Sequence, residues 1–205
     1  MKKILFASSN LSKIEQFQFI ANLYHIDVEI VSVYSKYPNI LPYSEDYNTQ
    51  YEIVDCGARE VYEQINEPVV VEDTILEVDS LEGQPGLLAN EYLREHGRSG
   101  LLEELKDEKD RGASITSIIG YFDGKQLVTV KNCLKGQIAR VETYKKGEPS
   151  WVGPTFTEFG GGFSSIFIPD GLEASLADLD KAEYAKRGYR DPNFYKILQI
   201  LVNSL

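Results

Sequence analysis

Cysteine and histidine are scarce in this sequence. Its 205 residues include only two cysteines and two histidines. Cys56 and Cys133 lack C-x-x-C spacing and have no histidine nearby, which disfavours a disulfide framework or a zinc site. His25 and His96 are isolated, so we expect ordinary surface or loop positions for them. Any chemistry must therefore rest on other side chains.

Long apolar runs are also absent. No run approaches the roughly 20 residues that span a bilayer. The first residues pass from Met1-Lys2-Lys3 directly into a short apolar segment, without the longer apolar region of a signal peptide. We therefore expect a cytoplasmic protein with no membrane partner.

Basic residues are outnumbered by acidic ones. Lysine and arginine total 21 against 32 aspartates and glutamates, which gives a net charge of −11. An acidic surface repels the phosphate backbone, so polymeric nucleic acid is an unfavourable partner. A small nucleotide is not excluded, because a few local cations and a divalent metal suffice to hold a triphosphate.

Hydrophobic periodicity predicts alternating strands and helices in the first half of the chain. A β-hairpin is expected around Asp123-Gly124, between segments 115–122 and 126–133. This order predicts an α/β protein with a mixed central β-sheet flanked by helices and two lobes with a cleft between them. Expected strands are 4–7, 28–33, 69–71 (with a possible extended continuation through Leu76 and Val78) and 166–169, and 34–48 is a loop. Helices are expected after the first strand, over 51–65, around 101–105, over 181–187 and from Asp191. The expected inward faces are Tyr51, Val54, Ala58, Val61 and Ile65 on the second helix, and Phe194, Ile197, Leu198 and Leu201 on the last.

The segment Ser8-Ser9-Asn10-Leu11-Ser12-Lys13 joins the first strand to the first helix. Unpaired N–H groups and the helix dipole favour an anion at such a junction, and Lys13 adds a full positive charge. Ser8 and Asn10 are also good helix N-caps, and a cap needs no ligand. The segment contains no glycine, so it is not a Walker loop.

Glu72 and Asp73 follow three valines at the end of an expected strand. Two adjacent carboxylates are costly there unless a cation binds, and magnesium takes oxygen ligands from carboxylates and substrate phosphates. Glu45, in a polar loop, is a third candidate metal ligand. The alternative is a solvated strand end and a solvated loop.

A cluster of cations lies near the C-terminus. Lys181, Lys186, Arg187 and Arg190 stand out in so acidic a chain and indicate a phosphate site, although a solvated helix face is the alternative.

These blocks together resemble the inosine triphosphate pyrophosphatase family, the house-cleaning nucleoside triphosphate pyrophosphatases. The resemblance spans nearly the whole chain. The matching blocks are Ser8-to-Lys13 with [ST]-x-N-x-x-K, Glu72-to-Leu76 with [DE]-D-[ST]-x-L, Gly83-to-Gly86 with G-x-P-G, Gly162-to-Phe167 with G-[YFW]-D-P-x-F, and Lys181-to-Gly188 with K-x-x-x-S-H-R-G.

The resemblance implies a role for each matching residue. Asp73 would be the catalytic acid, and Mg²⁺ would be held by Asp73, Glu72 and Glu45. It also implies a homodimer. The residues that would bind substrate are Ser8, Asn10, Lys13, Thr74, Gly162, Phe163, Ser164, Lys181, Lys186 and Arg187.

The chain departs from the family pattern where the family reads the base. Ser164 stands in place of an acid, Ala185 and Lys186 replace a serine and a histidine, and Gly57 stands where a substrate-binding lysine is common. The metal-and-phosphate half matches the pattern. These departures bear on the family's usual preference for inosine and xanthosine triphosphates.

The sequence thus predicts one nucleotide pyrophosphatase domain over residues 1–205. It would hydrolyse a purine nucleoside triphosphate, of the inosine or xanthosine type, to monophosphate and pyrophosphate with Mg²⁺. Two alternatives stay open: the same chemistry on a modified or pathway-specific nucleotide, and a non-catalytic nucleotide-binding sensor.

Overall fold

The computed structural model describes residues 2–153 and 162–203. The chain divides into two compact units. Unit 1 comprises Met1–Asp73, Ser117–Asn132 and Arg190–Leu205, and unit 2 comprises Thr74–Thr116 and Cys133–Tyr189. The prediction of a single functional domain over 1–205 stays a prediction.

A mixed β-sheet is the central element of the chain, as the sequence predicts. Strand β1 (Lys2–Phe6) pairs in parallel with β2 (Val28–Ser32) and with β3 (Val69–Val78). Antiparallel pairing joins β3 to β4 (Pro85–Gly86), and β6 (Leu127–Ile138) to β7 (Phe167–Pro169). With β5 (Gly112–Phe122), the strand order is β2-β1-β3-β5-β6-β7, and β4 pairs with β3 outside this path.

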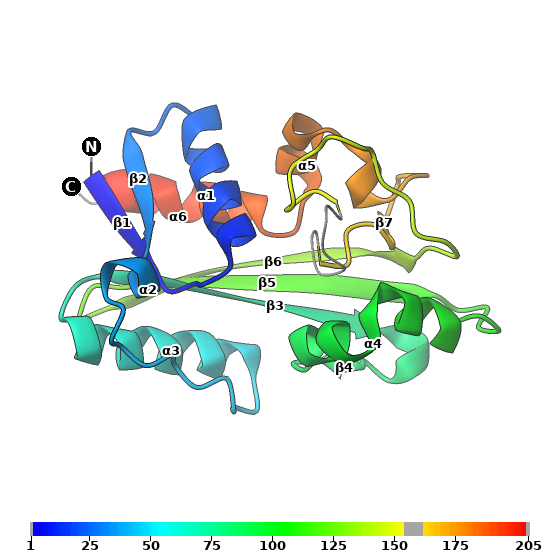
Figure 1. Cartoon of the computed structure of the whole chain (residues 1–205), viewed down its shortest axis with the longest axis horizontal. Coiled ribbons are helices and arrows are strands. Elements are labelled where there is room, and N and C mark those ends of the chain that lie inside the picture. Colours follow the sequence, from blue (N-terminus) through cyan, green and yellow to red (C-terminus); the bar gives the residue numbers. More distant parts are fainter. Residues whose placement is uncertain (1, 154–161, 204–205) are drawn as a thin grey trace. The chain divides into compact units, whose positions relative to one another are not determined.

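Side-chain caps mark the starts of three of the helices, which Figure 1 draws as coiled ribbons. The side chains of Asn10, Thr49 and Asp180 accept backbone N–H groups at the starts of the first, third and fifth helices. The helices are α1 (Leu11–Leu23), α2 (Val33–Lys36), α3 (Gln50–Ile65), α4 (Ala89–Glu104), α5 (Lys181–Arg187) and α6 (Asp191–Asn203), with short 3₁₀ turns at Asp79–Leu81 and Leu176–Asp178.

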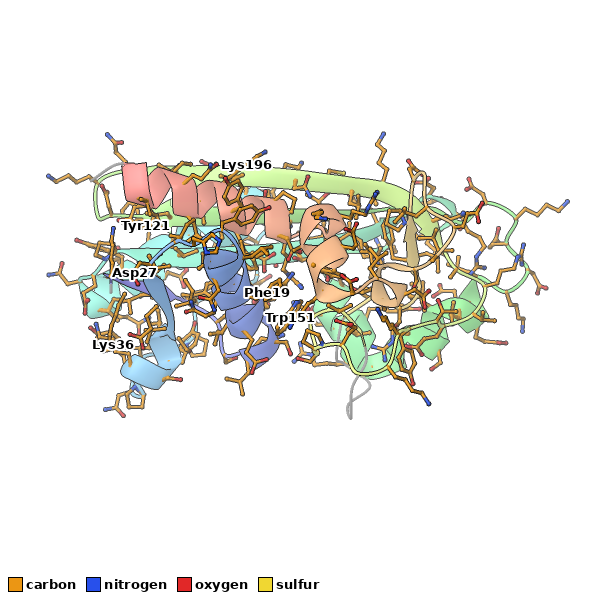
Figure 2. All side chains as sticks on the ribbon, turned by 90° about the horizontal axis from the view of Figure 1, so that it is seen from above. Phe19, Asp27, Lys36, Tyr121, Trp151 and Lys196 are labelled. Atoms are coloured by element: carbon orange, nitrogen blue, oxygen red, sulfur yellow. The ribbon has the colours of Figure 1, made fainter. Side chains whose placement is uncertain are left out.

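Some details differ from the sequence prediction. Strand β3 does not end at residue 71 but continues to Val78, so Glu72 and Asp73 are buried inside a strand rather than at a solvated strand end. The expected loop 34–48 begins with the short helix α2, whose last residue Lys36, labelled in Figure 2, ion-pairs with Glu67. Tyr51 was expected on the buried face of α3, but it is 51% exposed, and Ile53 is buried instead. A residue in the first turn of a helix can project beyond the layer that the helix covers, so periodicity alone misplaced it.

Side-chain alternation along β1 gives unit 1 a core on each face of its strands. On one face, Phe6 packs edge-on against Phe17 of α1 and Phe194 of α6, and the rings of the latter two stack 4.3 Å apart. On the other face, Leu5 clusters with Ala58 and other residues of α3. Figure 1 accordingly shows α1 and α6 on one side of these strands and α3 on the other.

Unit 2 has its own apolar core. It gathers buried residues of α4, β5, β7 and α5, among them Leu101, Ile115, Phe167 and Tyr184. Within the residues that the structure describes, no helix combines the length and the apolar character needed to cross a membrane.

A buried polar pair joins α1 to α6 within unit 1. Gln16 Nε2 donates to Asp191 Oδ2 at 2.9 Å, and both residues are almost fully buried. Among the described residues, Asp191 Oδ1 and Gln16 Oε1 have no hydrogen-bond partner. Burial raises the pKa of Asp191 to about 7, against the lowering effect of the bond from Gln16. A protonated carboxyl has the O–H donor that Gln16 Oε1 lacks.

We expect this pair to make stability depend on pH. Folded Asp191 keeps its proton up to about pH 7, whereas the unfolded chain releases it near pH 4. The folded state therefore binds more protons in this window, and the free energy of unfolding falls as pH rises, by up to about 1.4 kcal/mol per pH unit. Asp191→Asn, which carries a permanent donor, should remove this slope and be the more stable protein at pH 8. Urea unfolding between pH 4.5 and 8 measures it, and parallel profiles for the two proteins would contradict it.

Candidate functional site

The junction of β1 and α1 is a capped turn. Asn10 Oδ1 accepts from the backbone N–H of Lys13, and Ser8 Oγ accepts from the N–H of Asn10. Ser32 at the end of β2 donates to the carbonyl of Ser8. The predicted capping role is therefore present. The turn also directs the half-buried Lys13 side chain from the first turn of α1 toward β3.

Glu72 lies on the face of β3 that meets α1 and the start of α6. Its carboxylate is fully buried, and it lies 3.0 Å from Lys13 Nζ and 3.3 Å from Arg190 Nε. Ser117 Oγ donates to it at 2.7 Å, and Asn193 Nδ2 in turn donates to Ser117 Oγ. Two cations and a hydroxyl compensate the cost of burying this carboxylate.

Asp73, the next residue, points to the opposite face because successive side chains of a strand alternate. On that face Gln50 of α3 donates to the backbone carbonyl of Asp73 at 3.0 Å. The Asp73 side chain is buried, and its Oδ2 has no hydrogen-bond partner among the described residues. A buried carboxylate oxygen without a donor is costly, so it fits a position that a cation would complete.

The pKa of Asp73 reflects this environment. Its pKa is raised to about 6: burial is the largest cause, Lys13 lowers the pKa, the charges of Glu72 and Glu45 raise it, and a hydrogen bond from Gln50 lowers it. Glu45 itself is exposed, on the segment between α2 and α3. Its influence on Asp73 places the two carboxylates within electrostatic reach of each other.

The three predicted metal ligands do not form one cluster. In the part of the chain that the structure describes, no three acidic, histidine or cysteine side chains converge as a metal site. Glu72 is occupied by Lys13 and Arg190 on one face of β3, and Asp73 lies on the other. Magnesium is commonly held by one or two carboxylates together with substrate phosphates, so Asp73 and Glu45 are the donors that fit it.

The predicted substrate residues of unit 2 include three cations on α5. Lys181, Lys186 and Arg187 are exposed. Lys186 Nζ lies 2.6 Å from Glu183, and Arg187 Nε lies 3.7 Å from the same carboxylate. The backbone N–H of Lys181 donates to Glu148. These i,i+3 and i,i+4 pairs are weak surface interactions, so the cations can turn to a ligand at small cost.

The altered block at 162–165 is built into the core of unit 2. Phe163 and Ser164 are buried, and Ser164 Oγ lies 2.9 Å from the hydroxyl of Tyr184 on α5. Gly162 has a positive φ of 54°, and its carbonyl accepts from Arg98. Ser165 Oγ donates to Glu142, which also ion-pairs with Arg98 at 2.5 Å. Ser164 therefore positions α5 in this structure. Thr74 begins the half of β3 that belongs to unit 2 and is half-buried.

Sequence reasoning missed part of this arrangement. It named Arg190 only as a member of a basic cluster and did not place it beside Glu72. Ser117 and Gln50 carried no signal, because a serine within a strand and a glutamine at a helix start are common. The space beside Gly57, where a family lysine was expected, is filled by the ring of Tyr43.

Comparison with known proteins gives consistent matches. A model of the Ham1 family matches residues 4–200. A protein of Methanopyrus kandleri named dITP/XTP pyrophosphatase is 33% identical over 92% of this chain and 90% of its own length. A protein of the same name from Thermococcus kodakarensis is 29% identical over 92% of this chain and 91% of its own length.

Solved structures agree on the fold. The Ham1 protein of Staphylococcus aureus is 22% identical and superimposes with a TM-score of 0.78, covering 100% of both chains. A structure from Mycobacterium abscessus, described as a nucleoside-triphosphatase and dITP/XTP pyrophosphatase, is 26% identical with a TM-score of 0.68, covering 96% of this chain and 98% of that one.

We predict that the bond between Ser164 and Tyr184 stabilises unit 2. Tyr184→Phe removes this partner from the buried Ser164 hydroxyl and should lower the free energy of unfolding by about 1–3 kcal/mol. Ser164→Ala in the same background should add less than it does alone, because the two hydroxyls act as a pair. A double-mutant cycle in urea measures the coupling, and strictly additive effects would show that the bond contributes nothing.

Proposed function

This chain belongs to the Ham1 family, and we propose that it hydrolyses a purine nucleoside triphosphate to the monophosphate and pyrophosphate. The substrates we propose are non-canonical ones such as dITP or XTP, after which its relatives from Methanopyrus kandleri and Thermococcus kodakarensis are named.

One observation carries this proposal at the level of residues. At the end of the buried valine run of β3, Lys13 from the first turn of α1 lies 3.0 Å from Glu72, while the neighbouring Asp73 keeps a buried oxygen without a hydrogen-bond partner among the described residues. A lysine at a helix N-terminus suits a phosphate chain, and an under-coordinated carboxylate suits a divalent cation.

The residues divide the work as follows. Lys13 and the start of α1, shaped by Ser8 and Asn10, bind the phosphates and stabilise the charge that builds on the departing pyrophosphate. Asp73 orients a water molecule and takes its proton as the water oxygen bonds to the α-phosphorus and the bond to the bridging oxygen breaks. Glu72 holds Lys13 in place.

We propose Mg²⁺ as the metal, held by Asp73 and Glu45 together with substrate oxygens. When bound, such a cation neutralises phosphate charge and polarises the reacting group. Asp73 lies on the α3 side of β3, and Glu45 lies on the segment between α2 and α3. Their carboxylates raise the pKa values of their neighbours, which is the electrostatic condition that a cation relieves.

The family resemblance also implies substrate-binding roles for residues of unit 2. These residues are Lys181, Lys186 and Arg187 of α5, together with Gly162 and Phe163. Because Ser164 and Ala185 are buried, we assign them a role in placing α5. Because Ser164, Ala185 and Lys186 depart from the family pattern, a modified or pathway-specific nucleotide is the alternative substrate to test. The acidic charge disfavours polymeric nucleic acid. We propose a cytoplasmic location and, on the family resemblance alone, a homodimer.

With Mg²⁺ present, we expect the protein to release pyrophosphate from at least one nucleoside triphosphate. A panel of ITP, dITP, XTP, ATP, GTP and modified nucleotides, followed by ³¹P NMR, identifies both product and preference. Orthophosphate as the first product would contradict the mechanism. Tight binding of a nucleotide without turnover would favour the sensor instead.

Asp73→Asn should lower turnover by about 10²-fold or more, because it removes the negative charge with little change in shape. The matched control is Asp27→Asn. Asp27, labelled in Figure 2, is an exposed aspartate on the turn before β2. Initial rates of pyrophosphate release at saturating Mg²⁺ make the comparison. If Asp73→Asn and Asp27→Asn retain equal activity, Asp73 has no part in the reaction.

A further inference from the structure

The segment Tyr37–Asn48, which we name the Glu45 loop, runs along helix α3 before the chain turns into it (Figure 1). Gly57, Glu60 and Gln64 of α3 contact this loop. Their spacing of three and four residues places them in one stripe along the helix surface. All of these residues belong to unit 1.

Glu60 contacts the loop on both sides of Glu45. Its Oε2 accepts from the backbone N–H of Ser44 at 3.0 Å, and its Oε1 accepts from the hydroxyl of Tyr47 at 2.7 Å. One carboxylate thus spans the four residues that contain Glu45.

The other two residues of the stripe fix the loop further toward its start. Gln64 exchanges two hydrogen bonds with the backbone of Leu41, at 2.8 and 3.1 Å. At Gly57, the ring of Tyr43 lies so close that a Cβ added there would be 2.6 Å from its Cδ2 atom. The loop is therefore seated on α3 at three successive points.

This seating has a consequence for Glu45. An exposed loop residue samples many positions, and ordering the backbone costs about 1–2 kcal/mol per residue. A ligand that is already held in place binds a metal without that ordering cost. In other metal sites, hydrogen bonds to the ligands hold them in this way. Glu60 forms no described ion pair of its own, because the neighbouring Arg59 pairs with Asp55.

We propose that Glu60 is a positioning residue that holds Glu45 ready for the divalent cation of the substrate, with Gly57 giving Tyr43 the space that this arrangement needs. This inference rests on the proposed function, in which Glu45 is a metal ligand.

The first test is Glu60→Gln. An amide offers one acceptor oxygen in place of two and carries no charge, so Glu60→Gln weakens the bonds from Ser44 and Tyr47. We expect the Mg²⁺ concentration for half-maximal pyrophosphate release to rise about three- to tenfold, the effect of one lost hydrogen bond, while turnover at saturating Mg²⁺ stays within about twofold. Hydrogen exchange of the Ser44 amide should become faster.

The matched control is Glu63→Gln, which makes the same charge change at an exposed position of the same helix. It should leave the Mg²⁺ requirement unchanged.

Gly57→Ala reaches the same end by a different route. It changes no charge and improves the intrinsic helix propensity of α3, but its methyl group displaces the ring of Tyr43. We expect a folded protein that is less stable than the parent, because the added methyl group overpacks the contact with Tyr43, and that needs more Mg²⁺. This variant keeps the inference testable if Glu60→Gln disturbs folding.

The decisive experiment measures the Mg²⁺ requirement of Glu60→Gln again, in a protein that also carries Glu45→Gln. If Glu60 acts through Glu45, Glu60→Gln should cause no further rise in the Mg²⁺ requirement there. An equal rise with and without Glu45, or no rise in either background, overturns the inference.

A readout without turnover separates this inference from the proposed function. Mn²⁺ binding in the presence of inorganic pyrophosphate, followed by electron paramagnetic resonance, should weaken three- to tenfold in Glu60→Gln and in Gly57→Ala. If no nucleoside triphosphate is hydrolysed, the proposed function fails, yet weaker Mn²⁺ binding still supports the positioning role. Unchanged Mn²⁺ binding in both variants overturns it.

Discussion

The site in unit 1 depends on the alternation of side chains along β3. Because Glu72 and Asp73 are adjacent in a strand, they must point to opposite faces. Glu72 enters the side covered by α1 and α6, where Lys13 and Arg190 meet it. Asp73 enters the side of α3, where its Oδ2 has no hydrogen-bond partner among the described residues. These two neighbouring residues therefore provide one carboxylate that is anchored by ion pairs, Glu72, and one that can bind a cation, Asp73.

The anchored charge ties distant parts of the chain together. Lys13 and Arg190 lie far apart in sequence, yet both must approach the single carboxylate of Glu72. Beside them, the stacked rings of Phe17 and Phe194 hold α1 against α6 in an apolar contact. An apolar contact tolerates small shifts of one helix along the other. A buried ion pair does not, because moving one partner away leaves the other charge buried and unpaired. We infer that packing brings the two helices together and that the charges fix which turn of each faces β3.

Periodicity and capping chemistry predicted most of the fold, because both are local. The Asn10 cap, the valine strand before Glu72 and the inward residues of α6 all follow from neighbours within a few positions. The pairing of Arg190 with Glu72 could not be predicted this way, since 118 residues separate them. The bond between Ser164 and Tyr184 was missed for the same reason. The family resemblance showed that Ser164 stands where the family has an acid, but it did not indicate that Ser164 bonds to Tyr184.

The α3 side of β3 explains why a loop must complete the site. Within unit 1, that face receives one carboxylate from β3, Asp73, because Glu72 is turned away and Glu77 belongs to unit 2. A second carboxylate for a cation has to come from outside the sheet, and the Glu45 loop is the segment seated on α3, the helix that covers this face. A loop ligand is intrinsically less ordered than a strand ligand. The contacts of Gly57, Glu60 and Gln64 order the loop. They therefore compensate for the single carboxylate that the alternation of side chains along β3 provides on this face.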